Sequence, residues 1–392
     1  MKIKGLLKDI TGSKRIIKAR ALEFKNADDK EIKEDYISNL ARALHPEKIL
    51  AKVSKIEKET SDSVKITFNS EQIPLFRAGT YLTVELNIGE SLVTRAYSIV
   101  SEPLDSYHHH YVEIIVKDYP DSFVASYLNK NLKVNDEVYL EVGLGQFGYD
   151  SYRDYKNIVC LAGGAGITPF LAMAKYFKAV NSDVNMTIIY GSEDPNNIIA
   201  FNELKELESE KLKVVHVISG NYPDYNGLKG FITKDIIKKY SSKETTYFFC
   251  GSVNMYHAIS KELAALNIDL RRLRKENFAI SDASKVSGFP LEAKNKEVNI
   301  EVHQGQYVTN IKALCKESIA TALERNGLYI HTCCRSGECG ACRIKVNKGE
   351  FFIPEGYDYR RAADKEFNYV HSCSTYPLSD LVIKINLDNR IH

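Results

Sequence analysis

Four cysteines of this sequence are spaced as the ligands of an iron–sulfur cluster would be. Cys334, Cys339 and Cys342 follow the pattern C-x4-C-x2-C, and Cys373 lies downstream, shortly before a final apolar segment. This is the plant-type [2Fe–2S] arrangement, in which four thiolates bind two irons. Structural zinc sites favour paired C-x2-C units, and one such pair occurs in this stretch. We therefore predict a [2Fe–2S] cluster here rather than a zinc knot.

The residues between these cysteines are suited to wrapping around a cluster. Four of them are the small residues Ser336, Gly337, Gly340 and Ala341. They let the backbone pass close to the inorganic sulfurs, so that amide N–H groups can donate hydrogen bonds to them. Cys333 lies beside Cys334 and could compete with it, but the four-residue spacing to Cys339 selects Cys334. We therefore interpret Cys333 as a residue that does not bind the cluster.

A glycine-rich turn at 163–169, with the sequence G-G-A-G-I-T-P, follows an apolar segment and precedes a helical pattern. Gly164 and Gly166 permit a tight turn and a close approach of the backbone to phosphate. Thr168 suits the N-cap and Pro169 the first helical turn, and the free N–H groups of a helix N-terminus favour a pyrophosphate. Because Pro169 stands where the G-x-G-x-x-G fingerprint has its third glycine, a plain strand–helix turn stays open as an alternative.

Two later positions strengthen the hypothesis of a nucleotide site. Glu193 and Asp194 follow the next apolar segment, where the ribose of a dinucleotide would lie. Carboxylates there accept hydrogen bonds from a 2′-hydroxyl and repel a 2′-phosphate, which favours NADH over NADPH. Cys250 and Gly251 end a further apolar segment, at the edge where such sheets bind ligands. A buried core residue is the alternative for Cys250.

The elements that must position these residues fall into three groups. After residue 51, short alternating segments bounded by Gly, Pro, Asn or Asp predict a small antiparallel barrel. Its expected strands are Ser63–Phe68, Tyr81–Asn87, Arg95–Val100, Tyr111–Lys117 and Glu137–Glu141. From residue 157, apolar strands alternate with helical patterns, which predicts a parallel sheet with crossover helices. The expected strands are Ile158–Ala162, Asn185–Tyr190, Lys213–Ser219 and Thr246–Cys250, and the expected helices extend to Lys178 and cover Asn202–Leu207 and Met255–Leu266.

The third group is a compact C-terminal module around the cysteine loop. Its expected elements are strands Glu297–His303, Tyr307–Ile311, Ile344–Val346 and Leu381–Ile385, and a helix Ile319–Asn326. A polar segment rich in Ser, Gly, Pro and Lys precedes it. Near the N-terminus, apolar residues at helical spacing predict a helix over Lys30–Leu44. This helix would either cover part of the body or contact a partner or another subunit.

These patterns divide the chain into five parts. They are an N-terminal helical extension (1–47), an antiparallel barrel (48–152), a nucleotide-binding α/β domain (153–282), a linker (283–296) and a C-terminal domain that contains the predicted [2Fe–2S] loop (297–392). A length of 392 residues fits two to four domains. With 44% apolar and 27% charged residues, disorder, collagen and coiled-coil arrays are excluded. The net charge of +2 implies no general attraction to nucleic acid or to a membrane.

The sequence predicts neither a secretory signal nor a membrane span. The first ten residues, MKIKGLLKDI, contain no apolar core of a signal peptide. The long uncharged run at 158–174 is interrupted by glycines and a proline, whereas a span needs about 20 predominantly apolar residues in one helix. We expect a strand, a turn and a helix there, and a cytoplasmic protein.

The order of barrel, nucleotide-binding sheet and cysteine loop resembles the ferredoxin–NAD(P)+ reductase superfamily with a C-terminal ferredoxin domain, as in reductase components of oxygenases. The resemblance covers about residues 48–392. It implies that residues 48–152 form a Greek-key flavin-binding barrel, residues 153–282 a parallel α/β NAD(P)-binding domain and residues 297–392 a β-grasp ferredoxin-like domain. It also implies that electrons move from NADH through FAD and the [2Fe–2S] cluster to a protein acceptor, which would be an oxygenase, another redox enzyme or a ferredoxin. The alternatives are a stand-alone NAD(P)H–ferredoxin reductase or diaphorase and a non-catalytic electron-relay subunit.

The resemblance assigns the flavin site to a strand that carries the family motif R-x-Y-S. The matching residues are Arg95, Ala96, Tyr97 and Ser98. By resemblance, Arg95 neutralises the FAD pyrophosphate, Tyr97 packs on the isoalloxazine and Ser98 donates a hydrogen bond near flavin N5. An arginine at a phosphate and an aromatic ring on the flavin both agree with the chemistry of those groups.

Other positions carry over from the family with one departure. The strand with Ile114 and Val116 resembles the one along the adenine side of the flavin. In the phosphate loop, Ser126 stands one place later than the usual serine, and the usual glycines are replaced. This departure leaves FMN as an alternative to FAD. Cys250 and the Glu-x-Phe segment with Glu276 and Phe278 match landmarks beside the nicotinamide, which implies positioning roles there.

Overall fold

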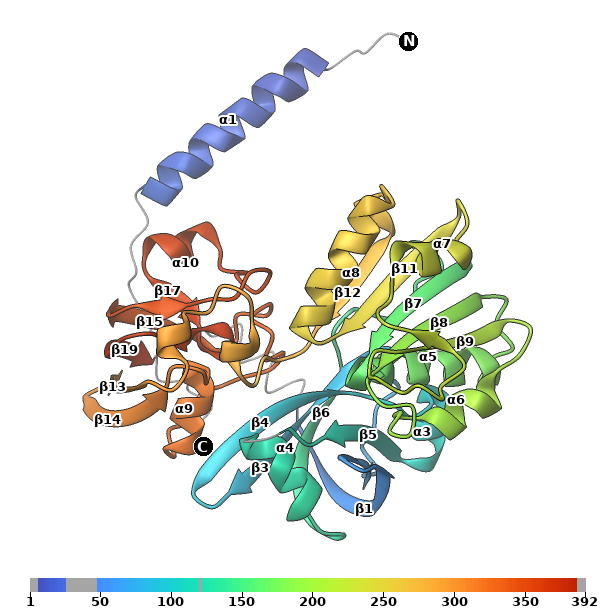
Figure 1. Cartoon of the computed structure of the whole chain (residues 1–392). Coiled ribbons are helices and arrows are strands. Elements are labelled where there is room, and N and C mark those ends of the chain that lie inside the picture. Colours follow the sequence, from blue (N-terminus) through green and yellow to red (C-terminus); the bar gives the residue numbers. More distant parts are fainter. Residues whose placement is uncertain (1–5, 26–47, 120–121, 386–392) are drawn as a thin grey trace.

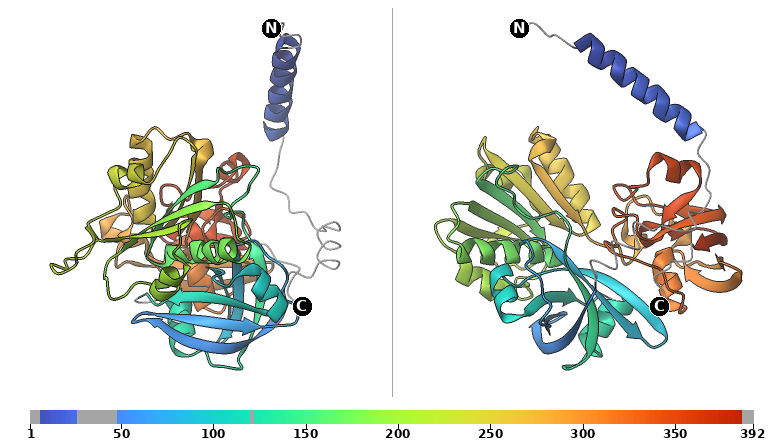
Figure 2. Two further views of the ribbon diagram at one scale, coloured as in Figure 1. Left: turned by 90° about the vertical axis from the view of Figure 1, so that its right-hand side faces the viewer. Right: turned by 180° about the vertical axis from the view of Figure 1, so that it is seen from behind.

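The computed structural model describes residues 6–25, 48–119 and 122–385. These form three domains that meet at a common junction and a separate N-terminal helix, α1 (Leu6–Lys25), which extends away from all three in each view (Figures 1 and 2). The predicted helix at Lys30–Leu44 lies outside the described residues, and α1 was not predicted. None of the described helices combines the length and the apolarity needed to cross a membrane.

The first domain is an antiparallel sheet of six strands in the order β4-β3-β6-β1-β2-β5. Its strands are β1 (Ile49–Thr60), β2 (Ser63–Asn69), β3 (Tyr81–Ile88), β4 (Ser91–Ser98), β5 (Tyr111–Lys117) and β6 (Glu137–Leu144). Five of them were predicted and β1 was not. Two short helices, α3 (Pro103–His109) and α4 (Phe123–Lys130), connect the strands around β5. Because β4 lies at one edge of the sheet, its outer side is free to receive another domain.

The second domain is a parallel sheet in the order β10-β9-β8-β7-β11-β12, as the alternating pattern predicted. Its strands are β7 (Asn157–Gly163), β8 (Asn185–Ser192), β9 (Leu212–Ile218), β10 (Leu228–Lys229), β11 (Thr245–Gly251) and β12 (Leu273–Asn277). Its helices are α5 (Thr168–Ala179), α6 (Phe201–Leu207), α7 (Lys234–Lys239) and α8 (Val253–Ala265). The uncharged run at 158–174 therefore forms a strand, a turn and a helix, as expected.

The third domain is a mixed sheet in the order β14-β13-β19-β15-β17, in which β13 and β19 are parallel. Its strands are β13 (Glu297–Gln304), β14 (Tyr307–Leu314), β15 (Arg343–Lys348), β17 (Tyr369–His371) and β19 (Leu381–Ile385). Strands β16 (Phe351–Phe352) and β18 (Tyr376–Pro377) form a separate two-stranded antiparallel sheet. Helix α9 (Ile319–Arg325) packs on the sheet and α10 (Ala362–Glu366) precedes β17. Ala283, Phe289 and Ala293 of the preceding polar segment are buried in this domain's core.

Candidate functional site

The third domain contacts the antiparallel sheet of the first domain at its edge strand, β4, which carries the R-x-Y-S motif. Helix α9 packs against β4, and the two lie side by side in Figure 1. The Thr332 hydroxyl donates to the backbone carbonyl of Thr94, at 3.4 Å. The phenol of Tyr81, on β3, lies 3.5 Å from the sulfur of Cys333. The cysteine loop is thereby placed directly against the strand that carries the R-x-Y-S motif.

The four predicted cluster ligands lie together as two pairs. The thiols of Cys334 and Cys339 are within hydrogen-bond reach of each other, and so are those of Cys342 and Cys373. Among the described residues, no three His, Cys, Asp or Glu side chains converge on one metal ion. Two thiol pairs suit two irons that share four thiolates. Cys333 also contacts Cys339, so its exclusion from the ligand set stays a prediction.

The backbone of the loop is shaped to enclose a small anionic group. Gly337 and Gly340 have φ values of +83° and +74°, which glycine adopts without strain. The backbone N–H of Cys339 points at the sulfur of Cys334, at 3.4 Å, and the N–H of Ala341 at that of Cys339, at 3.5 Å. Amides directed at thiolate sulfur stabilise negative charge there. The donor set and the loop therefore fit a [2Fe–2S] cluster.

Strand β4 presents the flavin motif toward the same junction. Arg95 is mostly buried, and its Nη1 donates to both carboxylate oxygens of Glu324 on α9, at 2.8 and 3.0 Å. Glu324 also binds Arg335 of the cysteine loop. One carboxylate between two guanidiniums leaves net positive charge, which fits a flavin phosphate beside Arg95. Tyr97 packs on the core of the barrel beside this cluster.

Ser98 and Glu276 form the polar centre of the junction. Ser98 Oγ and Glu276 Oε2 are buried, and neither makes a hydrogen bond of ordinary geometry in the part of the chain that the structure describes. Burial raises the pKa of Glu276 to about 8, and the carboxylate of Glu338, in the cysteine loop, adds to this rise. The Ser98 hydroxyl lies near enough to Glu276 to offset part of this rise in the pKa of its carboxyl group. Glu276 is therefore protonated near neutral pH. Buried polar atoms without a well-formed hydrogen bond usually face a ligand or water, so these two atoms fit the polar edge of a flavin.

Three residues that the resemblance assigns to the flavin site have side chains that already pack or bond within the first domain. Ile114 and Val116 are fully buried in the barrel core, which leaves the backbone of β5 as the part a flavin could contact. Ser126 lies inside helix α4, and its hydroxyl accepts a hydrogen bond from Lys130, at 2.9 Å. The sequence of β5 does not alternate between apolar and polar residues, because Ile115, on the opposite face, packs against the core of the second domain. The pattern therefore did not show that Ile114 and Val116 face the barrel core.

The glycine turn is packed tightly against the neighbouring strand. A Cβ on Gly166 would lie 2.1 Å from the carbonyl oxygen of Cys250, so only glycine fits there. Residues 164–167 form a 3-10 turn that continues into α5. The prediction that Thr168 is the N-cap is wrong, because Thr168 is already helical and its hydroxyl donates to the Ala165 carbonyl, at 2.8 Å. Pro169 lies in the first helical turn, as predicted.

The carboxyl edge of the parallel sheet brings the predicted nicotinamide residues together. Cys250, on β11, pairs in register with Glu276 on β12 and is buried. Burial raises the pKa of its thiol, and nearby Glu276 adds to this rise. The side chain of Met255 covers Gly163 and Gly251. Its sulfur would lie 2.0 Å from a Cβ on Gly163 and 2.6 Å from a Cβ on Gly251. Met255 was not predicted from the sequence.

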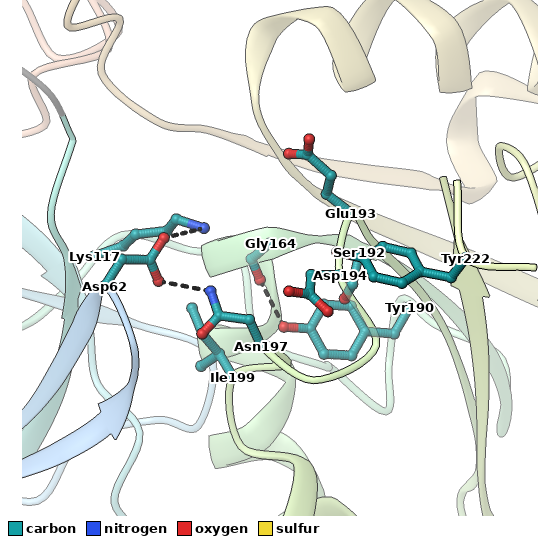
Figure 3. Close-up of a pocket in the computed structure, with 10 residues that line it drawn as sticks. All are labelled: Asp62, Lys117, Gly164, Tyr190, Ser192, Glu193, Asp194, Asn197, Ile199 and Tyr222. Atoms are coloured by element: carbon teal, nitrogen blue, oxygen red, sulfur yellow. Dashed lines mark hydrogen bonds and ion pairs between the residues drawn. The ribbon is translucent and has the colours of Figure 1, made fainter. Parts of the chain in front are cut away.

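A cavity of about 280 Å³ lies between the first two domains, next to the glycine turn. Figure 3 shows the carboxylate of Asp194 directed into it and that of Glu193 pointing away from the other labelled side chains. Gly164 lines it as well, as the prediction of a nucleotide site requires. The lining residues that were not predicted are Asp62, Lys117, Tyr190, Ser192, Asn197, Ile199 and Tyr222.

The cavity is bounded on one side by contacts between the first two domains and by an ion pair within the first domain. Asn197 donates to Asp62, at 3.0 Å, and Lys117 pairs with Asp62, at 3.1 Å. The backbone N–H of Ala200 donates to Glu59, at 2.7 Å. The contacts of Asn197 and Ala200 join residues more than 100 positions apart, so no local sequence signal identified them. Lys117 thus lines the cavity together with the carboxylates of Glu193 and Asp194, which suit a ribose.

The third domain also holds the end of β12. The hydroxyl of Tyr357 donates to the carbonyl of Phe278, at 3.0 Å, and that of Tyr376 to the carbonyl of Ile280, at 2.8 Å. Asn277 donates to the Tyr359 hydroxyl, at 3.0 Å. Phe278 itself packs on the core of the second domain. The cysteine-loop domain therefore contacts both predicted redox sites.

Family models match three successive parts of the chain. They are the oxidoreductase FAD-binding domain at residues 50–149, the oxidoreductase NAD-binding domain at 160–261 and the 2Fe-2S iron-sulfur cluster binding domain at 295–378. Their order is the one predicted from the motifs. The FAD-binding match supports FAD as the flavin.

Proteins of similar length match over most of the chain. The glycine betaine monooxygenase reductase subunit of Chromohalobacter salexigens is 25% identical over 350 residues, which are 84% of this chain and 93% of that protein. One component of the 1,2-phenylacetyl-CoA epoxidase of Escherichia coli is 25% identical over 347 residues, covering 84% and 96%. The structure of phthalate dioxygenase reductase matches with a TM-score of 0.65 at 21% identity, over 87% of this chain and 99% of that one. That structure confirms the predicted fold class.

Proposed function

Because this chain belongs to the oxidoreductases that combine FAD-binding, NAD-binding and C-terminal [2Fe–2S] ferredoxin domains, we propose that NADH is its electron donor and an oxygenase its protein acceptor. It is the electron-transferring reductase component of such a system. The observation that carries this function is the junction of the three domains, where the third domain contacts β3 and β4 through the cysteine loop and the segment after β12 through Tyr357. An oxygenase as the acceptor is supported by the relatives that are reductase subunits of a monooxygenase.

The residues of the junction have separable tasks in this function. When bound, FAD accepts a hydride and a [2Fe–2S] cluster transfers single electrons, so the pair converts a two-electron donor into a one-electron output. Arg95 would hold the phosphate charge of the flavin, Tyr97 would pack on its ring system and Ser98 Oγ would donate a hydrogen bond to it. Glu276 has a raised pKa, so its carboxyl group carries a proton near neutral pH. Cys250 and the Met255 side chain shape the surface on which the nicotinamide lies.

The test of this function is an anaerobic stopped-flow experiment on the purified holoprotein. On mixing with NADH, we expect the flavin absorbance to bleach first and the cluster bands to follow. Reduction of an added one-electron protein acceptor should depend on the cluster. A stand-alone diaphorase would instead reduce small acceptors equally well without its cluster, and an electron-relay subunit would show no flavin bleaching by NADH.

Preference for NADH rests on the carboxylates beside the cavity. Glu193→Arg replaces a negative charge by a positive one in the lining of the cavity, next to Asp194, so we expect the NADH/NADPH ratio of kcat/KM to fall by about tenfold or more. The measurement is steady-state kinetics with both nucleotides. Glu210→Arg makes the same charge change at an exposed site before β9, at the opposite edge of the sheet, and serves as the control. An unchanged ratio in Glu193→Arg would refute this assignment.

The N-terminal extension is proposed to contact a partner or another subunit. Helix α1 stands apart from the three domains (Figure 1) and exposes Ile16, Ile17 and Leu22. The cytoplasmic location stays a prediction from the sequence.

A further inference from the structure

A buried ion triad joins the flavin motif to the cysteine loop. Glu324, on α9, is 1% exposed in its side chain, and Arg335 is 4% exposed. Arg335 donates from Nη1 and Nη2 to the two carboxylate oxygens, at 2.9 and 3.0 Å. Arg95 donates to the same two oxygens from the other domain. The carboxylate thus lies between one guanidinium of each domain, with water almost completely excluded.

Each arginine of this triad is also directed toward a redox site. Arg335 follows the ligand Cys334 and interacts with the thiols of Cys342 and Cys373. Arg95 belongs to the flavin motif and lies next to Tyr97. In the described part of the chain both arginines pair with Glu324, and no second carboxylate pairs with either. Two cations and one anion leave a positive charge that two anionic cofactors would balance.

The backbone at Arg335 has a conformation that needs support from its surroundings. Arg335 has a φ of +58°, in the left-handed region that non-glycine residues seldom adopt. Such a conformation persists where surrounding interactions hold the residue in it. The bidentate pair with Glu324 is a contact of that kind. It directs the Arg335 side chain toward the carboxylate that Arg95 of β4 also binds.

We propose that Glu324 is a positioning residue for electron transfer, because it ties Arg335 of the cysteine loop to Arg95 of the flavin motif. It acts through these two arginines, and so sets the separation between the flavin site and the cluster site. This inference rests on the proposed function, since it concerns the internal transfer step that the function requires. It also predicts that flavin binding and docking of the third domain influence each other, because both use Arg95.

The test is Glu324→Gln in the full-length holoprotein. The substitution keeps the side-chain size but leaves two guanidiniums facing each other, so the cysteine loop should separate from β4. In anaerobic stopped-flow we expect flavin bleaching by NADH at the wild-type rate and cluster reduction slowed by about tenfold or more. Backbone hydrogen exchange should rise in the segments around 91–98 and 332–342. FAD affinity should stay equal or increase, because Arg95 no longer shares its charge with a carboxylate.

Two further variants separate positioning from a general loss of structure. Glu324→Asp keeps the charge and should recover most of the cluster-reduction rate. Glu317→Gln removes another mostly buried carboxylate of the third domain, one that pairs with Arg325 within that domain, at 2.7 Å, and should leave both steps and both segments unchanged. Loss of iron or weaker FAD binding in Glu324→Gln, or a wild-type rate of cluster reduction, would overturn the proposal. Absence of cluster reduction in the wild-type protein would overturn the proposed function instead.

Discussion

Cys342→Ser is expected to give a protein that binds FAD and accepts electrons from NADH but carries no stable cluster. Cys342 is 1% exposed, and its thiol lies against that of Cys373. Serine replaces sulfur by a poor iron ligand of similar size, so the fold should survive while one of four ligands is lost. We expect reduction of a one-electron protein acceptor to fall by at least about 100-fold. Iron and sulfide analysis, the visible spectrum and acceptor kinetics measure these outcomes.

Cys333→Ser is the matched control for this variant. Cys333 lies next to the ligand Cys334 and contacts Tyr81, so the substitution changes the same loop without removing a predicted ligand. It should retain a full complement of iron and sulfide and most of the acceptor activity. A cluster that survives in Cys342→Ser but is lost in Cys333→Ser would show that the ligand set derived from the C-x4-C-x2-C spacing is wrong.

The cluster site and the fold were predictable because their signals are local. Three of the four cysteines occur within nine residues, and the spacing alone carries the chemistry. After residue 157 the spacing of apolar residues similarly identifies strands and helices, and their alternation predicts a parallel sheet. The strands predicted at Tyr111–Lys117 and Leu381–Ile385 have the same bounds in the structure.

The contacts between domains could not be predicted in this way. Glu324 is a charged residue in a short helix, and its partner Arg95 lies 229 positions away, so nothing in the sequence links them. The cavity beside the glycine turn depends equally on Asp62 and Asn197, which meet only when the first two domains pack together. Thr168 shows a local failure, because a 3-10 turn at 164–167 moved the start of the helix and left the threonine inside it.

Gly166→Ala is the second change with a large expected effect. Its added methyl group would lie 2.1 Å from the Cys250 carbonyl oxygen and 2.7 Å from the Cα of Gly251. Both contacts are with backbone, which cannot rotate away as a side chain would. Either the glycine turn or the end of β11 must therefore move, and both lie in the predicted nucleotide site. We expect flavin reduction by NADH to slow by about 100-fold and the free energy of unfolding to fall by about 1–3 kcal/mol.

Gly191→Ala is the control that separates this effect from a general intolerance of alanine at the edge of the sheet. Gly191 ends the register of β8 against β7, and a methyl group there would lie 3.6 Å from its nearest neighbour, an ordinary contact. NADH affinity is measured by anaerobic titration of the flavin absorbance, and chemical reduction with dithionite shows whether flavin and cluster remain intact. Because the atoms displaced in Gly166→Ala lie outside the predicted flavin and cluster sites, dithionite should still reduce both cofactors fully. Wild-type NADH affinity in Gly166→Ala would mean that the turn does not hold the pyrophosphate, and the nucleotide site would then have to lie elsewhere on the sheet.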